Sequence, residues 1–322
     1  MGQTAKDADL LDMANNLALM QQYCQSKESK FVFAIAPNKN TLYADKMPYA
    51  GKNPGANARK LMSLLQEKGV NTADLFGALS GQKEILYFPH DSHWNSKGAA
   101  LGADCINQAL GVESRYFAGD FSKKAPYRGD LYDMLYPGCA DPQTDSLYGG
   151  KLNFSYATAA QKPDSITLLT KSDKPGSLLC YRDSFGNLLY PYLADSYGDC
   201  RFSRGVSYDL TGEYDNVAIE LVERNLNYLI TYLPVMPAPK ASVEKTKPVG
   251  SVSLQVQSGD MQKVTGALPT QKDAGSPVYL FTENGCYQAF SLKDNKFGGY
   301  LLEAPTAVGC YVNGIFQTYT AK

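Results

Sequence analysis

The spacing of apolar residues changes once along this chain, and the change limits which folds it can adopt. Up to about residue 235, short apolar runs such as 31–36 alternate with segments whose apolar residues recur at helical spacing. From residue 250 onward, apolar residues stand at every second position, as in 251–256. Alternating strands and helices favour a layered α/β domain with a mainly parallel sheet, whereas period two favours antiparallel strands. We therefore predict a three-layer α/β domain followed by a small all-β module.

The predicted elements of the first part follow from periodicity and from helix stop signals. Two helical segments end at Gly69 and Gly111, a residue type that commonly follows the last helical turn. The stretch 116–165 is rich in Gly, Pro, Asp and Tyr, so we expect long surface loops there. Helices are expected at 7–28, 58–65, 99–110 and 188–195, and strands at 31–36, 84–88, 166–170, 177–182, 200–203 and 217–222.

A proline-rich stretch separates the two patterns. Pro237, Pro239 and Pro248 stand among Ala, Lys and Val, a composition typical of a semi-rigid linker. We therefore predict an α/β domain at 1–235, a linker at 236–249 and a β-module at 250–322. Within the module, strands are expected at 251–256, 278–281, 287–290 and 300–302, with a hairpin turn at Asn313-Gly314.

Charge and hydropathy exclude some classes of partner. The net charge is −1, from 31 basic and 32 acidic residues, so no strong field of one sign exists to attract nucleic acid or an anionic membrane surface. No apolar run reaches the roughly 18 residues that a membrane-spanning helix needs. The chain starts with Met1-Gly2-Gln3-Thr4 and enters a helical pattern almost at once. We expect a leader to have been removed from this sequence.

The cysteines give no sign of a metal centre. Seven are present, an odd number, and none belongs to a C-x-x-C pair, which argues against zinc and dithiol chemistry. Cys286 and Cys310 both lie in the β-region and could pair. We expect no metal and no cofactor.

Two segments carry the residues most suited to catalysis. Pro89-His90-Asp91-Ser92-His93-Trp94-Asn95 follows one predicted strand, and Tyr181-Arg182-Asp183-Ser184-Phe185-Gly186-Asn187 follows another and precedes a helix. Loops that leave the carboxyl ends of parallel strands meet at one edge of the sheet, where ligands bind. The chain has two His, and both lie in the first segment. Any chemistry that depends on His must therefore use this segment.

The chemistry that fits these residues is nucleophilic catalysis by a serine. A hydroxyl attacks well only when a base removes its proton, and His titrates near neutral pH. A carboxylate then orients the ring and stabilises its charged form. We predict Ser184 as nucleophile, His93 as base and Asp91 as its orienter. His90 is the alternative base, and Asp91 could instead cap the helix that begins near Lys97.

These segments resemble a known family. The D-x-H-W motif, an early strand and loop, and a serine block match the alginate O-acetyltransferase family, which has an SGNH-hydrolase-like domain. The likeness covers roughly residues 5–235, and its specificity comes from the order of five matches. They are 33–48, Asp91-Ser92-His93-Trp94, Gly129-Asp130-Leu131, Tyr181-Arg182-Asp183-Ser184-Phe185 and Val222-Glu223-Arg224.

The resemblance implies roles for individual residues. Ser184 would carry the acetyl group, His93 would act as general base and acid, Asp91 would orient it, and the backbone N–H of Ser184 would bind the oxyanion. The second oxyanion donor is not placed. As residues that line the substrate pocket we name Arg182, Tyr190 and Lys39.

The function that follows is acetyl transfer to or from hydroxyls of a cell-envelope or secreted polysaccharide, outside the cytoplasm. If the enzyme is a transferase, the family implies a separate membrane O-acyltransferase as acetyl donor. A plain carbohydrate acetylesterase and a non-catalytic glycan-binding surface protein are the alternatives. Family members can carry a carbohydrate-binding β-module, and aromatic residues of this one could stack on sugars or build its core. These are Tyr279, Tyr287, Phe290 and Tyr300.

Overall fold

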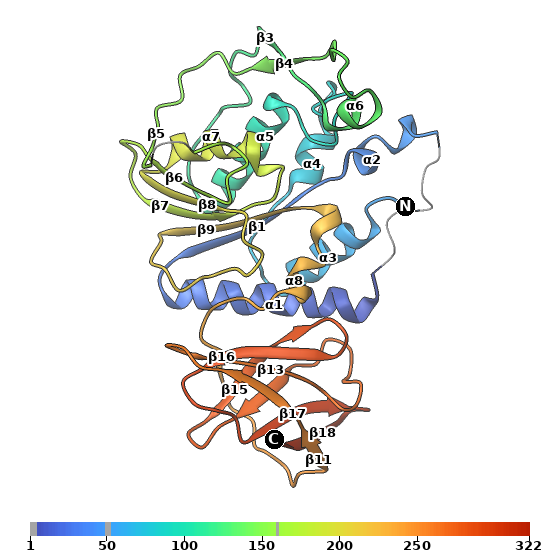
Figure 1. Ribbon diagram of the computed structural model, residues 1–322, viewed down its shortest axis with the longest axis vertical. Helices are drawn as coiled ribbons and strands as arrows, with labels where there is room; N and C mark the ends of the chain where they lie inside the picture. The colour runs from blue at the N-terminus through green and yellow to red at the C-terminus, as the bar shows by residue number, and fades with distance from the viewer. Residues whose placement is uncertain (1–4, 49–52, 159–160) are drawn as a thin grey trace.

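A computed structural model describes residues 5–48, 53–158 and 161–322, and a seven-stranded sheet organises the first part of the chain (Figure 1). The sheet is mixed rather than parallel throughout. Neighbours in β2-β1-β9-β7-β8 run parallel, whereas β6 is antiparallel to β8 and β5 is antiparallel to β6. In sheet order the strands are β2 (Thr72–Ala73), β1 (Lys30–Ala36), β9 (Asn216–Val222), β7 (Ser177–Tyr181), β8 (Asp199–Ser203), β6 (Thr167–Lys171) and β5 (Ser155–Tyr156).

Helices cover both faces of this sheet, so the predicted three layers are present. Alternate residues of each central strand enter opposite cores: Val32 and Ala34 pack with one set of helices, Phe31 and Phe33 with the other. This is the period-two geometry of a strand buried on both sides. The first core contains α4 (Leu75–Ser80), α5 (Ser96–Leu110) and α7 (Gly186–Ser196), and the second contains α1 (Asp7–Ser26), α3 (Ala56–Glu67) and α8 (Tyr228–Thr231).

The predicted strand at 84–88 does not join the sheet. Leu86, Tyr87 and Phe88 are buried, which explains the apolar pattern. Their backbone, however, pairs with the returning chain: Asn95 N donates to Leu86 O (2.9 Å) and Phe88 N donates to His93 O (3.2 Å). The segment is therefore a short loop that doubles back on itself before α5. The N-terminus of α5 is capped by Asn95, whose side chain accepts from Gly98 N, and not by Asp91.

The expected loop region 116–165 carries short elements of its own. They include a hairpin of β3 (Lys123–Pro126) and β4 (Thr144–Leu147), with α6 (Asp130–Leu135) between its strands. Further short helices lie beside the carboxyl edge of the sheet, and these are α2 (Lys39–Leu42), η1 (Ala44–Lys46) and η2 (Glu223–Asn225).

The C-terminal part is all β, as the period-two pattern predicts. Asn313 and Gly314 have φ of 51° and 75°, the left-handed pair that a two-residue hairpin turn requires. The predicted strand at 251–256 is instead divided, because its first half pairs with the last strand and its second half with another. The order is β11 (Gly250–Val252), β18 (Ile315–Ala321), β17 (Ala307–Val312), β14 (Val278–Phe281), β15 (Cys286–Leu292), β16 (Lys296–Leu301), β13 (Gln262–Ala267) and β12 (Leu254–Gln257), with β10 (Lys240–Ala241) paired to β15.

Helix α1 lies between the two sheets (Figure 1). Phe290 of β15 is fully buried in the core that contains α1, so this aromatic does not face a ligand. Asn16 of α1 donates to Ser291 O (2.9 Å) and accepts from Ser291 N (3.2 Å). Tyr300 also packs against this core, whereas Tyr279 makes an edge-to-face contact with Phe316 within the module.

The first half of the expected linker packs against the folded protein and pairs with strands of the β-module. Met236 is buried, Ala238 N donates to Tyr300 O (2.8 Å), and Gln288 N donates to Pro239 O (2.8 Å). That the chain folds as two units joined at 236–249 stays a prediction.

The remaining sequence expectations concern cysteines and membrane spans. All seven cysteines are unpaired, so Cys286 and Cys310 do not form the disulfide that their positions allowed. Among the described residues, no helix combines the length and apolar character that crossing a membrane requires. That a leader has been removed from this sequence stays a prediction.

A buried ion pair joins α1 to the β-module. Lys272 Nζ lies 2.8 Å from Asp12 Oδ1 and also donates to Ser276 O (2.9 Å). Burial raises the pKa of Asp12, and Lys272 opposes that rise. The carboxylate therefore depends on the ammonium group for its charge.

We predict that Lys272→Met lowers the free energy of unfolding by about 3 kcal/mol, because it leaves a buried carboxylate without its cation. The double variant Asp12→Leu/Lys272→Met should recover most of that loss. Urea unfolding at pH 7 measures both. A double variant no more stable than Lys272→Met would contradict this role for the pair.

Glu220 is the one ionisable residue of the central strand β9. Its side chain is fully buried, and neither carboxyl oxygen has a hydrogen-bond partner within the described ranges. Burial raises the pKa of Glu220 well above its usual value, and the charge of Asp183 adds to this, while Arg182 opposes it. The group is therefore held as a neutral acid in the folded protein.

The raised pKa of Glu220 makes the stability of the protein depend on pH. Below about pH 4.3 the unfolded chain also holds the proton on Glu220, so the folded state loses nothing by keeping it. Above that pH the unfolded chain releases this proton first, and the free energy of unfolding falls as pH rises. We predict that Glu220→Gln removes this slope and makes the protein more stable than wild type at pH 8. Urea unfolding at pH 5 and pH 8 tests it, with the exposed Glu113→Gln as control. Equal slopes in wild type and Glu220→Gln would rule out a buried neutral acid.

Candidate active site

The two segments singled out in the sequence meet at the carboxyl edge of the sheet. Ser184 follows β7 and stands just before α7. His93 lies on the loop that doubles back before α5. The indole of Trp94 joins the two segments, since its Nε1 donates to Phe185 O (3.0 Å).

Ser184, His93 and Asp91 form one hydrogen-bonded line. His93 Nε2 is 2.8 Å from Ser184 Oγ, and His93 Nδ1 is 2.6 Å from Asp91 Oδ1. The imidazole rests on the ring of Phe185, with centroids 4.8 Å apart. The side chain of Asp91 is 3% exposed and that of His93 is 18% exposed, so the carboxylate is shielded while the ring stays open to a substrate.

Asp91 is held as a charged acceptor. Its Oδ1 also accepts from His93 N (2.8 Å), and its Oδ2 accepts from Asp130 N (2.9 Å). Burial acts to raise the pKa of Asp91, but the hydrogen bonds from His93 and from the Asp130 amide outweigh it and lower that pKa. The carboxylate is therefore ionised near neutral pH and can support a protonated imidazole.

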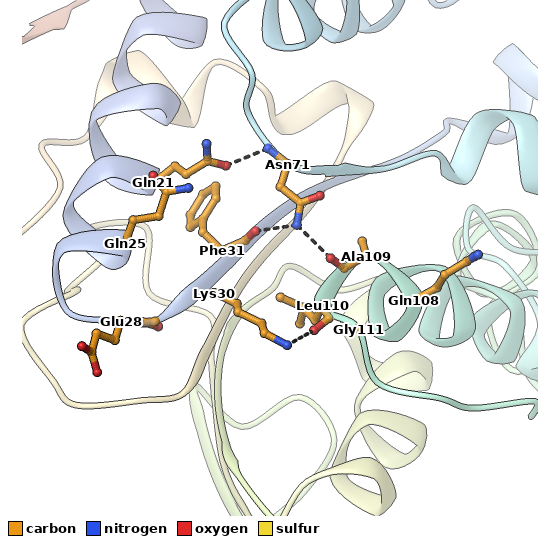
Figure 2. A pocket seen from close by; sticks show the side chains of 11 residues that line it. Gln21, Gln25, Glu28, Lys30, Phe31, Asn71, Gln108, Ala109, Leu110 and Gly111 are labelled. Atoms are coloured by element: carbon orange, nitrogen blue, oxygen red, sulfur yellow. Dashed lines mark hydrogen bonds between the residues drawn. The ribbon is translucent and has the colours of Figure 1, made fainter.

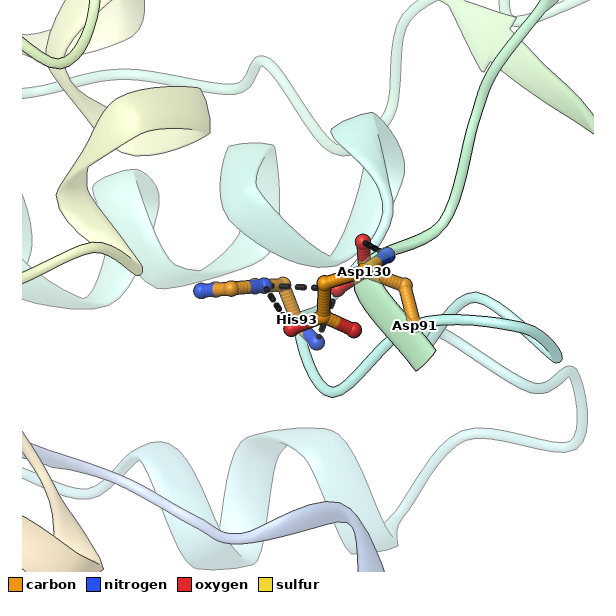
Figure 3. A group of neighbouring side chains, drawn as sticks. All are labelled: Asp91, His93 and Asp130. Carbon is orange, nitrogen blue, oxygen red and sulfur yellow. Dashed lines mark hydrogen bonds and ion pairs between the residues drawn. The ribbon is translucent and has the colours of Figure 1, made fainter. Parts of the chain in front are cut away.

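Asp130 is a residue of this site that the sequence prediction did not assign a role. Figure 3 shows it beside Asp91 and His93. Its carboxylate accepts from Ser92 N (2.8 Å) and Ser92 Oγ (2.6 Å), and lies 3.7 Å from His93 Nδ1. The only earlier signal was its place in the Gly129-Asp130-Leu131 match.

The same three side chains could in principle offer ligands to a cation, since one ligand atom of each lies within 4.8 Å of the others. His93 Nδ1, however, is already 2.6 Å from Asp91 Oδ1, a hydrogen-bond distance that leaves no room for an ion between them. The arrangement suits proton transfer through the ring, and the absence of a metal requirement stays a prediction.

Asp183 fixes the turn that presents Ser184. Its Oδ1 accepts from Phe185 N (2.9 Å), and its Oδ2 accepts from Val222 N (2.8 Å) and Asn225 Nδ2 (2.8 Å). These bonds tie the serine turn to the end of the neighbouring strand β9. The sequence showed Asp183 only as the residue before the serine, without this function.

The other predicted site residues make most of their contacts within the protein. Lys39 Nζ donates to Phe88 O (2.6 Å), Pro89 O (2.7 Å) and Asp91 O (3.0 Å), and so braces the His93 loop. Tyr190 is buried, with its hydroxyl 2.6 Å from that of Tyr156. Their binding of substrate stays a prediction.

Arg182 is the one predicted substrate-binding residue that lines a cavity together with Ser184. It is 3% exposed and donates to Asn187 Oδ1 (2.5 Å) and Pro163 O (2.6 Å). The cavity has a volume of about 160 Å³, and Arg204 and Tyr208 also line it.

His90, the alternative candidate for the general base, does not contact Ser184. Its Nδ1 lies 2.6 Å from Asp141 Oδ1, and its ring stacks on Tyr132. Among the described residues, the imidazole hydrogen-bonded to Ser184 is that of His93.

A second cavity, of about 540 Å³, lies at the opposite end of the sheet (Figure 2). Lys30 at the start of β1 and Asn71 before β2 line it. Figure 2 shows that their side chains form hydrogen bonds with nearby backbone carbonyls. Lys30 Nζ donates to Leu110 O (2.8 Å), and Asn71 Nδ2 donates to Phe31 O and Ala109 O. These contacts join β1 to α5 and indicate a structural role.

Solved structures from two bacteria have the same fold. A DHHW family protein from Eubacterium siraeum is 16% identical, with a TM-score of 0.53 over 70% of this chain and 90% of its own. Bacillus cereus PatB1, solved with a sulfonyl adduct, is 18% identical, with a TM-score of 0.56 over 69% of this chain and 91% of its own. At these identities the likeness establishes the fold. No curated protein sequence matches the chain.

A family model gives a closer assignment. The model for the SGNH hydrolase-like domain of acetyltransferase AlgX matches residues 2–179, which is more than half of the 322 residues. The matched stretch contains Asp91, His93 and Asp130 and ends shortly before Ser184. Ser184 is linked to them by its hydrogen bond with His93. The chain therefore belongs to the AlgX-type family of SGNH hydrolase-like acetyltransferases.

Proposed function

We propose that this protein moves acetyl groups to or from the hydroxyls of a cell-envelope or secreted polysaccharide through an acetyl-Ser184 intermediate. The observation that carries the proposal is the continuous line from Asp91 Oδ1 through His93 to Ser184 Oγ, with contacts of 2.6 and 2.8 Å. Each contact is short enough for a proton to be held or passed.

In the first step Ser184 Oγ attacks the acetyl carbonyl carbon while its proton passes to His93 Nε2. The tetrahedral intermediate collapses, its bond to the donor alcohol breaks, and the proton on His93 goes to the departing oxygen. The acetyl group is then an ester of Ser184. In the second step His93 takes a proton from an acceptor hydroxyl while that oxygen attacks the acetyl carbon. The bond from this carbon to Ser184 Oγ then breaks, and the proton on His93 passes to Oγ and regenerates the serine.

The charge that develops during each step has support on this site. Asp91 is ionised and stabilises the imidazolium form of His93. For the oxyanion we propose the backbone N–H of Ser184, which stands at the approach to α7. Asp183 holds this turn through Phe185 N, so the donor is in place before substrate binds.

The acceptor decides whether the reaction is transfer or hydrolysis. A sugar hydroxyl gives a transferase, and water gives an acetylesterase with the same intermediate. Membership of an acetyltransferase family favours transfer. We therefore propose a polysaccharide acceptor outside the cytoplasm and, as acetyl donor, a separate membrane O-acyltransferase. The assembled line of Ser184, His93 and Asp91 argues against a purely glycan-binding protein.

We predict that Ser184→Ala lowers the turnover of a small activated acetyl ester at least about 1,000-fold, because the nucleophile is lost. Ser26→Ala, an exposed serine of α1, is the matched control and should keep the wild-type rate. Initial rates of ester hydrolysis measure both. Turnover by Ser184→Ala equal to the control would exclude Ser184 as nucleophile.

Asp91→Asn should lower kcat for the same ester about 10³- to 10⁴-fold and leave KM near its wild-type value, because the ring loses its orienting charge. The lowered pKa of Asp91 adds a second readout. A carboxylate with a depressed folded pKa stabilises the protein above its unfolded pKa of about 3.9, and this stabilisation is lost as pH falls through the folded value.

The acid side of the stability curve should therefore be flatter in Asp91→Asn than in wild type. Urea unfolding between pH 5 and the acid transition measures the slope, and Asp133→Asn serves as the exposed control. A full loss of kcat with an unchanged acid slope would show that Asp91 is not the ionised group described here.

A further inference from the structure

The orienting carboxylate of the site is itself held by a part of the chain that lies far from it in sequence. Asp130 N donates to Asp91 Oδ2 (2.9 Å), and the Asp130 carboxylate accepts from both N and Oγ of Ser92. These contacts come from the stretch between β3 and β4, which we call the 127–143 excursion. The position of Asp91 therefore depends on how this excursion is fixed.

Apolar packing holds this excursion at its start, where the ring of Tyr127 stacks on that of Phe88 with centroids 3.8 Å apart, but it does not hold α6. Helix α6 presents large side chains to solvent, with Met134 79% and Leu135 72% exposed. No residue of α6 is buried. Beyond Tyr127, the position of Asp130 therefore depends on polar contacts at the base of α6.

His90 supplies contacts of this kind from the catalytic loop. Its backbone N donates to Gln143 Oε1 (3.0 Å), and its carbonyl accepts from Tyr132 N (3.1 Å). Its Nδ1 lies 2.6 Å from Asp141 Oδ1, and its ring stacks on that of Tyr132, with centroids 5.3 Å apart. His90 thus contacts both α6 and the last residues of the excursion.

Asp141 completes the connection to Asp130. Its side chain is 1% exposed, its Oδ1 accepts from Gln143 N (3.0 Å), and its Oδ2 accepts from Gly129 N (3.0 Å). The next amide along the chain is that of Asp130, which reaches Asp91. Gly129 is packed so closely that a Cβ there would lie 2.1 Å from His90 O, so the two backbones meet without a side chain between them.

We propose that His90 and Asp141 form a positioning pair that holds the Asp130 amide on Asp91, and through Asp91 sets the orientation of His93. The proposal rests on the proposed function, since it concerns the same reaction. His90 touches neither Ser184 nor the line of proton transfer, so it is a positioning residue and not a catalytic one. Lys39 braces the same loop from the other side, through the carbonyls of Phe88, Pro89 and Asp91.

The pair resembles the catalytic one in geometry but differs in what it reaches. Both histidines of the chain present Nδ1 to an aspartate at 2.6 Å. His93 Nε2 meets a serine hydroxyl, whereas the ring of His90 lies against Tyr132. The second His–Asp pair therefore acts on geometry: it fixes a loop, and the loop delivers one backbone N–H to the buried carboxylate.

The test compares variants of the pair with a matched variant of the same excursion. His90→Leu and Asp141→Asn should lower kcat for a small activated acetyl ester about 10- to 100-fold, the range seen for groups that orient a functional side chain. KM should stay within about twofold. His90→Asn, which returns an N–H donor near the place of Nδ1, should recover most of kcat. Asp133→Asn breaks the exposed pair with Arg128 (2.8 Å) and should keep the wild-type kcat.

A cycle with Asp91→Asn separates positioning from a general loss of stability. If the pair acts through Asp91, His90→Leu should change kcat less than about twofold in the Asp91→Asn background. Rates are divided by the folded fraction, measured by circular dichroism at the assay temperature, so that partial unfolding does not enter. Asp141→Asn keeps the side-chain shape and decides the matter if His90→Leu does not fold.

The outcomes separate this proposal from the proposed function. Wild-type kcat in Asp141→Asn and His90→Leu, with turnover abolished in Ser184→Ala, would overturn the positioning pair alone. A raised KM at unchanged kcat would also overturn it, because the pair would then contact substrate. Equal losses from His90→Leu in both backgrounds would exclude action through Asp91. Full turnover in Ser184→Ala would instead remove the proposed function.

Discussion

Two carboxylates, Asp91 and Asp183, fix the loops that meet at the catalytic edge, and the rest of the site depends on them. Asp91 gathers His93 and the Asp130 amide, while Asp183 gathers the serine turn and the end of β9. Each carboxylate accepts from backbone N–H groups that would otherwise lack a partner in an irregular loop. The 2.8 Å contact between His93 and Ser184 forms because each loop is fixed by its own carboxylate and the indole of Trp94 joins the two.

This arrangement uses the same physical device at increasing distance from the nucleophile. Asp183 holds the serine turn, Asp91 holds the imidazole, and in our proposal Asp141 holds the segment that reaches Asp91. In each case a carboxylate accepts hydrogen bonds from backbone amides of a neighbouring loop. Further from the site, α1 forms part of the core below the sheet and carries the β-module through Asn16 and Asp12.

The sequence predicted the layered architecture and named the three side chains that meet in one hydrogen-bonded line, because both leave local marks. Strands buried on two faces read as apolar runs, and the only two histidines lie on one loop. It failed at 84–88, where three buried apolar residues looked like a strand but pair with their own return. Periodicity reports burial and does not report the hydrogen-bonding partner. It also missed Asp130, Asp141 and Asp183, whose roles come from contacts to distant backbone amides that no local pattern records.

The central claim is that Ser184 carries the acetyl group. The most direct measurement is the mass of the peptide that contains Ser184 after brief exposure of the protein to an activated acetyl ester and acid quenching. The account predicts an increase of one acetyl group on this peptide in the wild type and none in His93→Gln, where the base is missing. An unmodified Ser184 peptide in a protein that turns over the ester, or acetylation that persists in His93→Gln, would contradict it.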